Sequence, residues 1–302
     1  MPFTPQSPLI IWRIVDGKPG HEKQTRGLAN ALARQVPTQA LDIVAAAPGK
    51  AFGYWILGRF PEGAGLASPH LILAAGHRTH FPALAARRAY GGKIILLMRP
   101  SLPYGWFDLC LVPDHDRPPH RSNILPTRGA INAVVRSATH DSTRGLIMIG
   151  GPSEHFSWDT DEIVRQVREL ISRDQGVLWT LTTSRRTPNE FLALLGSVHA
   201  DCHPAEETAP GWLEARLEEC AQAWVTPDSV SMVYEALTSG CHVGLFHLQP
   251  NPESQVAQAM RVLARDGLVL TVGNAGHVPE MPGVGFDEAT RCAGIVLERW
   301  FK

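Results

Sequence analysis

The stretch PLIIWRIVDGKPGHEKQTRGLANAL, residues 8–32, decides the fold. Its first eight residues form a nearly continuous apolar run, which is typical of a strand buried on both faces of a sheet. A glycine-containing turn, residues 16–20, comes next, and an amphipathic helical pattern then runs through Leu28 and Leu32. A strand, a turn and a helix in this order form the repeating unit of a parallel α/β sheet.

The same alternation recurs along the first half of the chain. Short apolar runs rich in β-branched residues are separated by helical patterns, which indicates a parallel sheet covered on both faces. The predicted strands of this half are residues 8–15, 40–44, 70–74, 93–98 and 107–112, with a shorter one at 122–127. The polar stretch RSATHDSTRG, residues 136–145, has no hydrophobic period and is interpreted as a linker.

The pattern starts again after the linker and predicts a second half of the same kind. Its predicted strands are residues 145–149, 177–182, 223–226 and 242–246. Its predicted helices are residues 159–173, a helix after Pro188, and residues 229–239. The last helical pattern, residues 287–300, could complete this half or cross back onto the first one. We therefore predict an α/β protein of two Rossmann-like domains, residues 1–138 and 139–302, whose parallel sheets face a central cleft.

Composition supports this organisation and excludes some functions. A chain of 302 residues exceeds the usual size of one hydrophobic core. Lys and Arg number 28 against 29 Asp and Glu, so no global positive field favours nucleic acid as a partner. The five cysteines are widely spaced without a CxxC pair, so they predict neither a disulfide framework nor a zinc site and fit a reducing cytoplasm.

The sequence predicts at most a peripheral contact with a membrane. The first residues lack the basic start and long apolar stretch of a signal peptide, and runs such as LIIW are far shorter than the roughly 20 residues that span a bilayer. Residues 51–60, AFGYWILGRF, place several aromatic residues beside Lys50 and Arg59. This segment could dip into a membrane interface, and the alternative is an ordinary packed helix.

Two strand-end loops of the first half carry candidate functional groups. Gly20 and His21 follow the first strand, where free helix amides can bind an anion and an imidazole can act as a general base. The alternative for His21 is a helix cap. Gly76, His77 and Arg78 follow the third strand and would line the same acceptor side. A metal site from His77 and the histidine three residues later is disfavoured, because no carboxylate or third ligand is nearby.

Two loops of the second half are suited to a diphosphate. The first contains two glycines with accessible backbone amides, and the second combines hydroxyl groups with two guanidinium groups before a helix. Neither GxGxxG nor a P-loop is present, and a solvated basic turn is the alternative for the second loop. The candidate residues are Gly150, Gly151, Ser153, Ser184, Arg185 and Arg186.

The segment VTPDSVSMVYEAL, residues 225–237, carries the most informative pattern. Ser229 and Ser231 begin a predicted helix, where free amides and the helix dipole favour a phosphate. Glu235 lies one turn deeper and could accept hydrogen bonds from ribose hydroxyls. A plain helix cap with a surface carboxylate is the alternative. Gln255 begins the next helix and could bind sugar hydroxyls.

These residues resemble those of GT-B glycosyltransferases. The second half is similar to the donor domain of the bacterial lipid-linked N-acetylglucosaminyl transferase of peptidoglycan synthesis. That resemblance implies phosphate contacts for Ser229 and Ser231, a ribose contact for Glu235 and a sugar contact for Gln255. The chain departs from that transferase in its first loop, where DGKPGHEKQ replaces a longer glycine cluster.

The whole chain resembles more closely the mitochondrial fission family of plants and proteobacteria, known by the elongated-mitochondria name. The matching stretches are DGKPGHEKQTRGLANAL, AAGHRTH, GGPSEHF, TTSRRTP and VTPDSVSMVYEAL. The resemblance covers nearly the full length. It implies the GT-B architecture, and it does not place the chain in a mitochondrion.

The leading functional hypothesis is glycosyl transfer from a nucleoside diphosphate sugar, with a uridine diphosphate sugar expected. The acceptor would be an envelope or lipid-linked saccharide, His21 the general base, and neither a metal nor a cofactor is expected. The alternatives are a non-catalytic adaptor with the same fold and a nucleotide-sugar epimerase. The expected location is cytoplasmic, with peripheral contact at the inner membrane left open.

Overall fold

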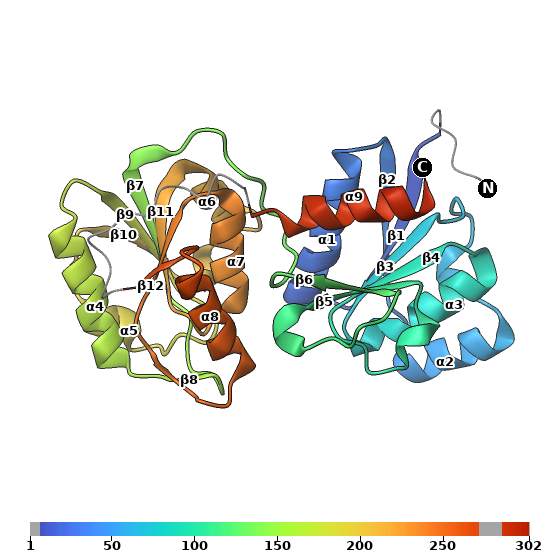
Figure 1. Cartoon of the computed structure of the whole chain (residues 1–302), viewed down its shortest axis with the longest axis horizontal. Coiled ribbons are helices and arrows are strands. Elements are labelled where there is room, and N and C mark those ends of the chain that lie inside the picture. The colour runs from blue at the N-terminus through green and yellow to red at the C-terminus, as the bar shows by residue number, and fades with distance from the viewer. Residues whose placement is uncertain (1–6, 272–285, 302) are drawn as a thin grey trace. The chain divides into compact units, whose positions relative to one another are not determined.

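The computed structural model describes residues 7–271 and 286–301. The chain divides into two compact units (Figure 1). Unit 1 comprises Met1–Ala133 together with Glu288–Lys302, and unit 2 comprises Val134–Asp287. Each unit has a mixed α/β structure built on a parallel sheet.

Unit 1 contains a six-stranded sheet in the order β2-β1-β3-β4-β5-β6, with all of its strand pairs parallel. Its strands are β1 (Leu9–Val15), β2 (Thr38–Val44), β3 (Leu71–Ala75), β4 (Lys93–Leu97), β5 (Leu109–Pro113) and β6 (Ile124–Thr127). In the register of β1, which lies between β2 and β3, Trp12 pairs with Leu41 on one side and Ile72 on the other. The strands interpreted from apolar runs in this half are thus confirmed, with ends that differ by one or two residues.

Helices cover both faces of this sheet because β1 is apolar on both sides. The helices of unit 1 are α1 (Pro19–Ala33), α2 (Pro48–Leu57), α3 (His80–Tyr90) and α9 (Glu288–Trp300). Leu9 and Ile11 belong to the core beneath α1 and α9, and Trp12 lies in the core on the opposite face, beneath α2 and α3. Short 3₁₀ turns occur at η1 (Pro61–Gly63), η2 (His77–Thr79), η3 (Tyr104–Trp106) and η4 (Asp114–Asp116).

Unit 2 repeats the architecture with a sheet in the order β10-β9-β7-β11-β12-β14, again parallel throughout. Its strands are β7 (Asp141–Met148), β9 (Leu178–Thr182), β10 (Ala200–His203), β11 (Cys220–Val225), β12 (His242–Leu245) and β14 (Leu270–Thr271). An antiparallel pair, β8 (Phe156–Ser157) and β13 (Gln249–Pro250), lies outside the main sheet. The helices are α4 (Thr160–Arg173), α5 (Phe191–Leu195), α6 (Trp212–Glu219), α7 (Val230–Ser239) and α8 (Gln255–Arg265), with a 3₁₀ turn η5 (Ala205–Glu207).

The boundary between the units lies a few residues before the one expected from the sequence. Val134 is buried in the core of unit 2, and the Ser137 amide donates to the Ser239 carbonyl of the same unit. The interpretation of residues 136–145 as a linker is partly wrong, because β7 already begins at Asp141. The sequence also missed β10, α6 and β14, which are short or half-exposed.

The last helix, α9, belongs to unit 1. This corrects the domain boundary that placed residues 288–302 in the second domain, and it agrees with the alternative that the helix crosses back onto the first half. Arg34 Nη2 donates to Thr290 Oγ1 at 3.1 Å, and the Arg128 amide donates to Glu288 Oε2 at 2.9 Å. Val296 is buried beside Leu28 in the same core. Within residues 7–271 and 286–301, no helix has both the length and the apolar content needed to cross a membrane.

Candidate functional site

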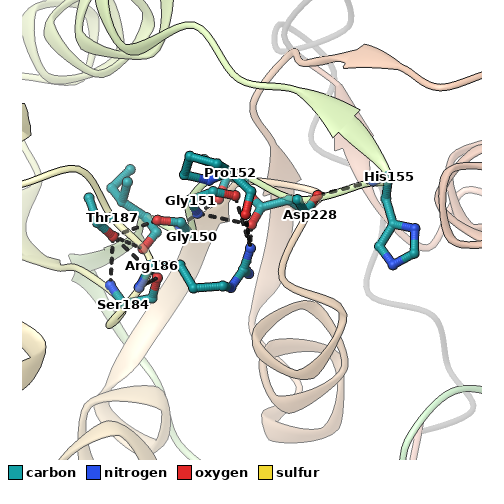
Figure 2. Close-up of polar contacts among 11 residues, drawn as sticks. Gly150, Gly151, Pro152, His155, Ser184, Arg186, Thr187 and Asp228 are labelled. Atoms are coloured by element: carbon teal, nitrogen blue, oxygen red, sulfur yellow. Dashed lines mark hydrogen bonds and ion pairs between the residues drawn. The ribbon is translucent and has the colours of Figure 1, made fainter.

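Three loops of unit 2 converge because β9, β7 and β11 are neighbours in a parallel sheet, whose carboxyl ends lie at one edge. Asp228, in the loop between β11 and α7, stands at the centre of this arrangement (Figure 2). Its side chain is only 1% exposed. A buried carboxylate requires hydrogen-bond donors or cations around it, and the loops after β7 and β9 supply them.

The carboxylate of Asp228 joins the two other loops (Figure 2). Its Oδ2 accepts a hydrogen bond from the Gly151 amide at 2.9 Å and another from Arg186 Nη2 at 2.8 Å. The adjacent Gly150 amide donates to Thr226 Oγ1 at 2.7 Å. A side chain at Gly150 would overlap the Asp228 carboxylate, so the close approach requires glycine there.

Arg186 and Thr187 complete the connection between the loops after β7 and β9. Arg186 Nη1 donates to the Gly151 and Pro152 carbonyls, each at 2.9 Å. Thr187 Oγ1 accepts from the Ser184 amide at 2.8 Å and contacts the carbonyls of Ile149 and Gly150. The loops are therefore held by specific polar contacts within unit 2.

These contacts change the interpretation of the glycine loop. The amides of Gly150 and Gly151 were expected to be accessible to a phosphate, and both instead donate to side chains of unit 2. Arg186 likewise directs its guanidinium to Asp228 and two carbonyls. Arg185, by contrast, is exposed and has no ion pair within the described part of the chain. Its role in binding a donor stays a prediction.

The start of α7 presents two serines next to this network. Ser229 is the N-cap residue, yet its side chain makes no capping hydrogen bond, and Ser231 is exposed in the first turn. The first amides of a helix lack intrahelical acceptors, so this end is suited to an anion. Glu235 is buried within the same helix and does not lie on its exposed face. Its predicted contact with ribose remains untested.

His155 connects Ser153 with Ser254, the residue before Gln255. Gln255 is exposed as the first residue of α8, and the preceding Ser254 caps that helix by accepting from the Ala257 amide at 3.2 Å. His155 Nδ1 lies 3.1 Å from Ser254 Oγ, and the His155 amide donates to Ser153 Oγ at 3.3 Å. The structure thus brings the loop after β7 to the start of α8.

In unit 1, His21 forms a pair with an acidic residue that the sequence analysis missed. His21 Nδ1 lies 3.0 Å from Asp16 Oδ2, and the Asp16 side chain is 1% exposed. Because a carboxylate only accepts, this contact places the proton on Nδ1 and the lone pair of the neutral ring on Nε2. Asp16 stands five residues before His21 in the same turn, a spacing that could have indicated the pair.

The loop after β3 lies directly against this histidine. A side chain at Gly76 would overlap the His21 ring, and Gly76 has φ +78°, which disfavours other residues. Gly20, His77 and Arg78 are exposed. The structure therefore brings the predicted loops after β1 and β3 together at the carboxyl edge of this sheet.

The histidines of the loop after β3 differ in their surroundings. His77 is exposed, whereas His80 is buried with Nδ1 3.2 Å from Ser101 Oγ. Burial lowers the pKa of His80 to about 4. Among residues 7–271 and 286–301, no group of three or more potential metal ligands from His, Cys, Asp and Glu is found.

Solved structures with a similar fold include nucleotide-sugar enzymes. A protein of Listeria monocytogenes named for UDP-N-acetylglucosamine 2-epimerase has a TM-score of 0.60 and 13% identity, covering 96% of this chain and 95% of its own. S. aureus MnaA with UDP has a TM-score of 0.52 and 12% identity, covering 96% of each chain. MurG of Acinetobacter baumannii has a TM-score of 0.51 and 12% identity, covering 97% and 99%.

These similarities assign a fold of the GT-B glycosyltransferase and epimerase type, as expected from the sequence. Among curated proteins, the uncharacterized protein RP120 of Rickettsia prowazekii is 23% identical, with coverage of 78% of this chain and 83% of that protein. The family profile described as Mitochondrial fission ELM1 matches residues 19–300. Because this match spans nearly the whole chain, the protein belongs to the mitochondrial fission ELM1 family.

Proposed function

We propose that the protein is a glycosyltransferase that uses a nucleoside diphosphate sugar, with a uridine diphosphate sugar as the donor and an envelope or lipid-linked saccharide as the acceptor. The observation that carries the catalytic part is the Asp16–His21 pair at 3.0 Å. A histidine oriented through Nδ1 by a buried carboxylate is arranged to accept a proton at Nε2. A purely structural adaptor has no need for this arrangement.

The proposed donor site is the carboxyl edge of the unit 2 sheet. The start of α7, with Ser229 and Ser231, binds the diphosphate, and the exposed Arg185 adds a cation. Glu235 and Gln255 recognise ribose and sugar hydroxyls. The network around Asp228 holds the loops in place and does not itself supply free donors to the phosphate.

The proposed reaction has a simple balance of bonds and charge. His21 Nε2 removes the proton of an acceptor hydroxyl, whose oxygen forms a bond to the anomeric carbon as the bond from that carbon to the diphosphate breaks. The departing diphosphate gains negative charge, which the α7 amides and Arg185 stabilise. On this proposal neither a metal nor a cofactor is required.

A second candidate function is nucleotide-sugar epimerisation. It is favoured by the structural similarity to the Listeria monocytogenes protein, at a TM-score of 0.60, and to S. aureus MnaA with UDP. Both functions need a nucleotide-sugar site, but only transfer needs an acceptor. Incubation with the donor alone distinguishes them, since an epimerase converts it without a second substrate.

The first experiment is a thermal-shift panel of nucleotides and nucleotide sugars. A ligand that binds only the folded state raises the midpoint by mass action, so a uridine compound should shift the wild type. Ser231→Asp should abolish this shift while keeping the protein folded, because an added carboxylate at a helix start repels phosphate but favours the helix dipole. Ser231→Ala is the matched control, which keeps the amides and should retain most of the shift.

The catalytic step is tested separately with the donor so identified. His21→Ala should abolish transfer while leaving the thermal shift by the donor intact. Unchanged turnover in this variant would remove His21 from catalysis. If no nucleotide or nucleotide sugar shifts the wild type, the proposal fails and the non-catalytic adaptor is favoured.

A further inference from the structure

Helix α2 of unit 1 presents an apolar outer surface. It lies beside α3 (Figure 1). Ala51 is its one buried residue. Phe52, Ile56 and Leu57 are 42%, 52% and 65% exposed. Because side chains four residues apart share a helix face, Phe52 and Ile56 form one stripe and Leu57 adjoins it. We call these three side chains the α2 surface.

An aromatic cluster under the α2 surface holds the helix in place. The Trp55 ring centroid is 5.9 Å from that of Phe81 and 5.2 Å from that of Trp106. Phe52 packs edge-on against Phe81 at 5.1 Å. These contacts anchor the inner side of α2 to α3 and to η3, so the exposed aliphatic side chains stand on a packed platform.

Two basic residues flank the α2 surface. Between Asp42 and Glu62 the sequence contains no carboxylate, and its charged residues are Lys50 and Arg59. Both are exposed and neither forms an ion pair within the described part of the chain. Lys50 lies over the Tyr54 ring, 5.4 Å from its centroid, at the start of the helix. Glu62 attracts Lys50 and, among the described residues, is the one carboxylate that acts on it. Two cations against one carboxylate leave a net positive charge beside the apolar surface, which favours a negatively charged interface.

We propose that the α2 surface docks on a lipid bilayer that contains anionic headgroups. Residues 51–58, AFGYWILG, include two side chains that can hydrogen-bond, Tyr54 and Trp55, and neither belongs to the α2 surface, so this surface offers few directional contacts for a specific protein partner. A bilayer interface requires only apolar insertion and positive charge, which this surface supplies. Helix α2 has ten residues and lies in the interface plane, with Lys50 and Arg59 at the headgroups.

The test is flotation with vesicles of phosphatidylcholine alone or with one third phosphatidylglycerol, performed without any sugar substrate. It is therefore independent of the proposed transfer reaction. The wild type should bind the anionic vesicles, and binding should fall as salt is raised. Ile56→Ser combined with Leu57→Ser should lower the partition coefficient at least tenfold. Lys50→Glu combined with Arg59→Glu should lower it about tenfold or more on anionic vesicles.

The matched control is Leu178→Ser combined with Leu194→Ser, which removes two aliphatic side chains of unit 2 that are 57% and 42% exposed. This variant should bind as the wild type does. All variants alter exposed side chains, and an unchanged thermal midpoint verifies their folding. Equal flotation of the wild type and the α2 variants would overturn the proposal. So would concentration-dependent self-association that Ile56→Ser abolishes, in the absence of any binding to vesicles.

Discussion

Asp228 and Arg186 form an ion pair with 2.8 Å between Oδ2 and Nη2, in which the carboxylate side chain is 1% exposed and the guanidinium side chain 44% exposed. The same Oδ2 accepts the Gly151 amide. The Asp228 carboxylate thus binds the loop of Gly150 and Gly151 in the place where a phosphate was expected. A bound diphosphate would therefore rely on the start of α7 and on Arg185, because the donors of the glycine loop are already engaged.

Removal of the Asp228 carboxylate should strongly destabilise unit 2. Asp228→Ala leaves the Gly151 amide and Arg186 without their acceptor, and loss of one partner of a buried pair costs about 3 to 5 kcal/mol. Because Arg186 is partly exposed to water, we expect the lower end of that range. Urea unfolding followed by circular dichroism measures the change in the free energy of unfolding.

Arg185→Ala provides the comparison for this prediction. Arg185 is exposed and has no ion pair in the described structure, so its removal should change stability by less than about 0.5 kcal/mol. If Arg185→Ala and Asp228→Ala destabilise the protein equally, the network around Asp228 does not hold the loops together.

The contact between His21 and Gly76 gives a second prediction. Gly76→Ala should both strain the backbone, at φ +78° and ψ 159°, and push the new methyl group into the His21 ring. Gly91→Ala is a matched control, because Gly91 has φ +79° and ψ −155° and open space around a new side chain. Thermal unfolding should show a clearly larger drop for Gly76→Ala. Equal drops would mean that backbone strain alone accounts for the effect.

Much of the fold was predictable because the buried strands are continuous apolar runs. LIIWRIV of β1 supplies side chains to both cores of unit 1, so its sequence reveals a strand covered on both faces. Strand β10, with the sequence ADCH, and helix α6, with only Leu217 buried, lack such a signal. The return of α9 to unit 1 depends on packing between residues that are distant in sequence, such as Val296 and Leu28.

The candidate site was less predictable for a related reason. Glycines and serines at strand ends indicate where a ligand could bind, but not whether their amides are free. The Gly151 amide is engaged by a residue 77 positions later, and Arg186 by one 42 positions later. Sequence alone does not reveal these pairings. The Asp16–His21 pair was accessible in principle, because both residues belong to one turn.

Asp16 should act as a positioning residue for His21. Asp16→Asn removes the charge that orients Nδ1, so it should lower kcat of the proposed transfer at least tenfold while KM for the donor changes little. Glu22→Gln, in the first turn of α1, serves as the control, because it keeps an acceptor for the Gly17 amide. Steady-state kinetics with the identified donor make this comparison. A change in donor KM without a change in kcat would instead assign Asp16 to the shape of the loop.

Burial of His80 should make the stability of the protein depend on pH. The imidazole has a pKa of about 4 in the folded state because burial disfavours its charged form, against an ordinary value of 6.5. Between these two values the unfolded chain binds the proton and the folded chain does not, so the free energy of unfolding rises with pH. This contribution is complete above pH 6.5 and is lost as the pH falls through 4, on the order of 3 kcal/mol.

Urea unfolding from pH 4 to 7.5 tests this dependence. His70, His140 and His242 also have pKa values lowered by burial, so the wild-type slope includes them. The His80 contribution is therefore the difference between the wild type and His80→Leu, whose slope should be smaller. His77→Leu removes an exposed histidine whose charge is the smaller of the two causes that lower the pKa of His80, so it should reduce the slope less than His80→Leu does. If His80→Leu leaves the slope unchanged, protonation of His80 does not oppose folding. The His80 ring would then be more accessible to water than its packing against Phe107 indicates.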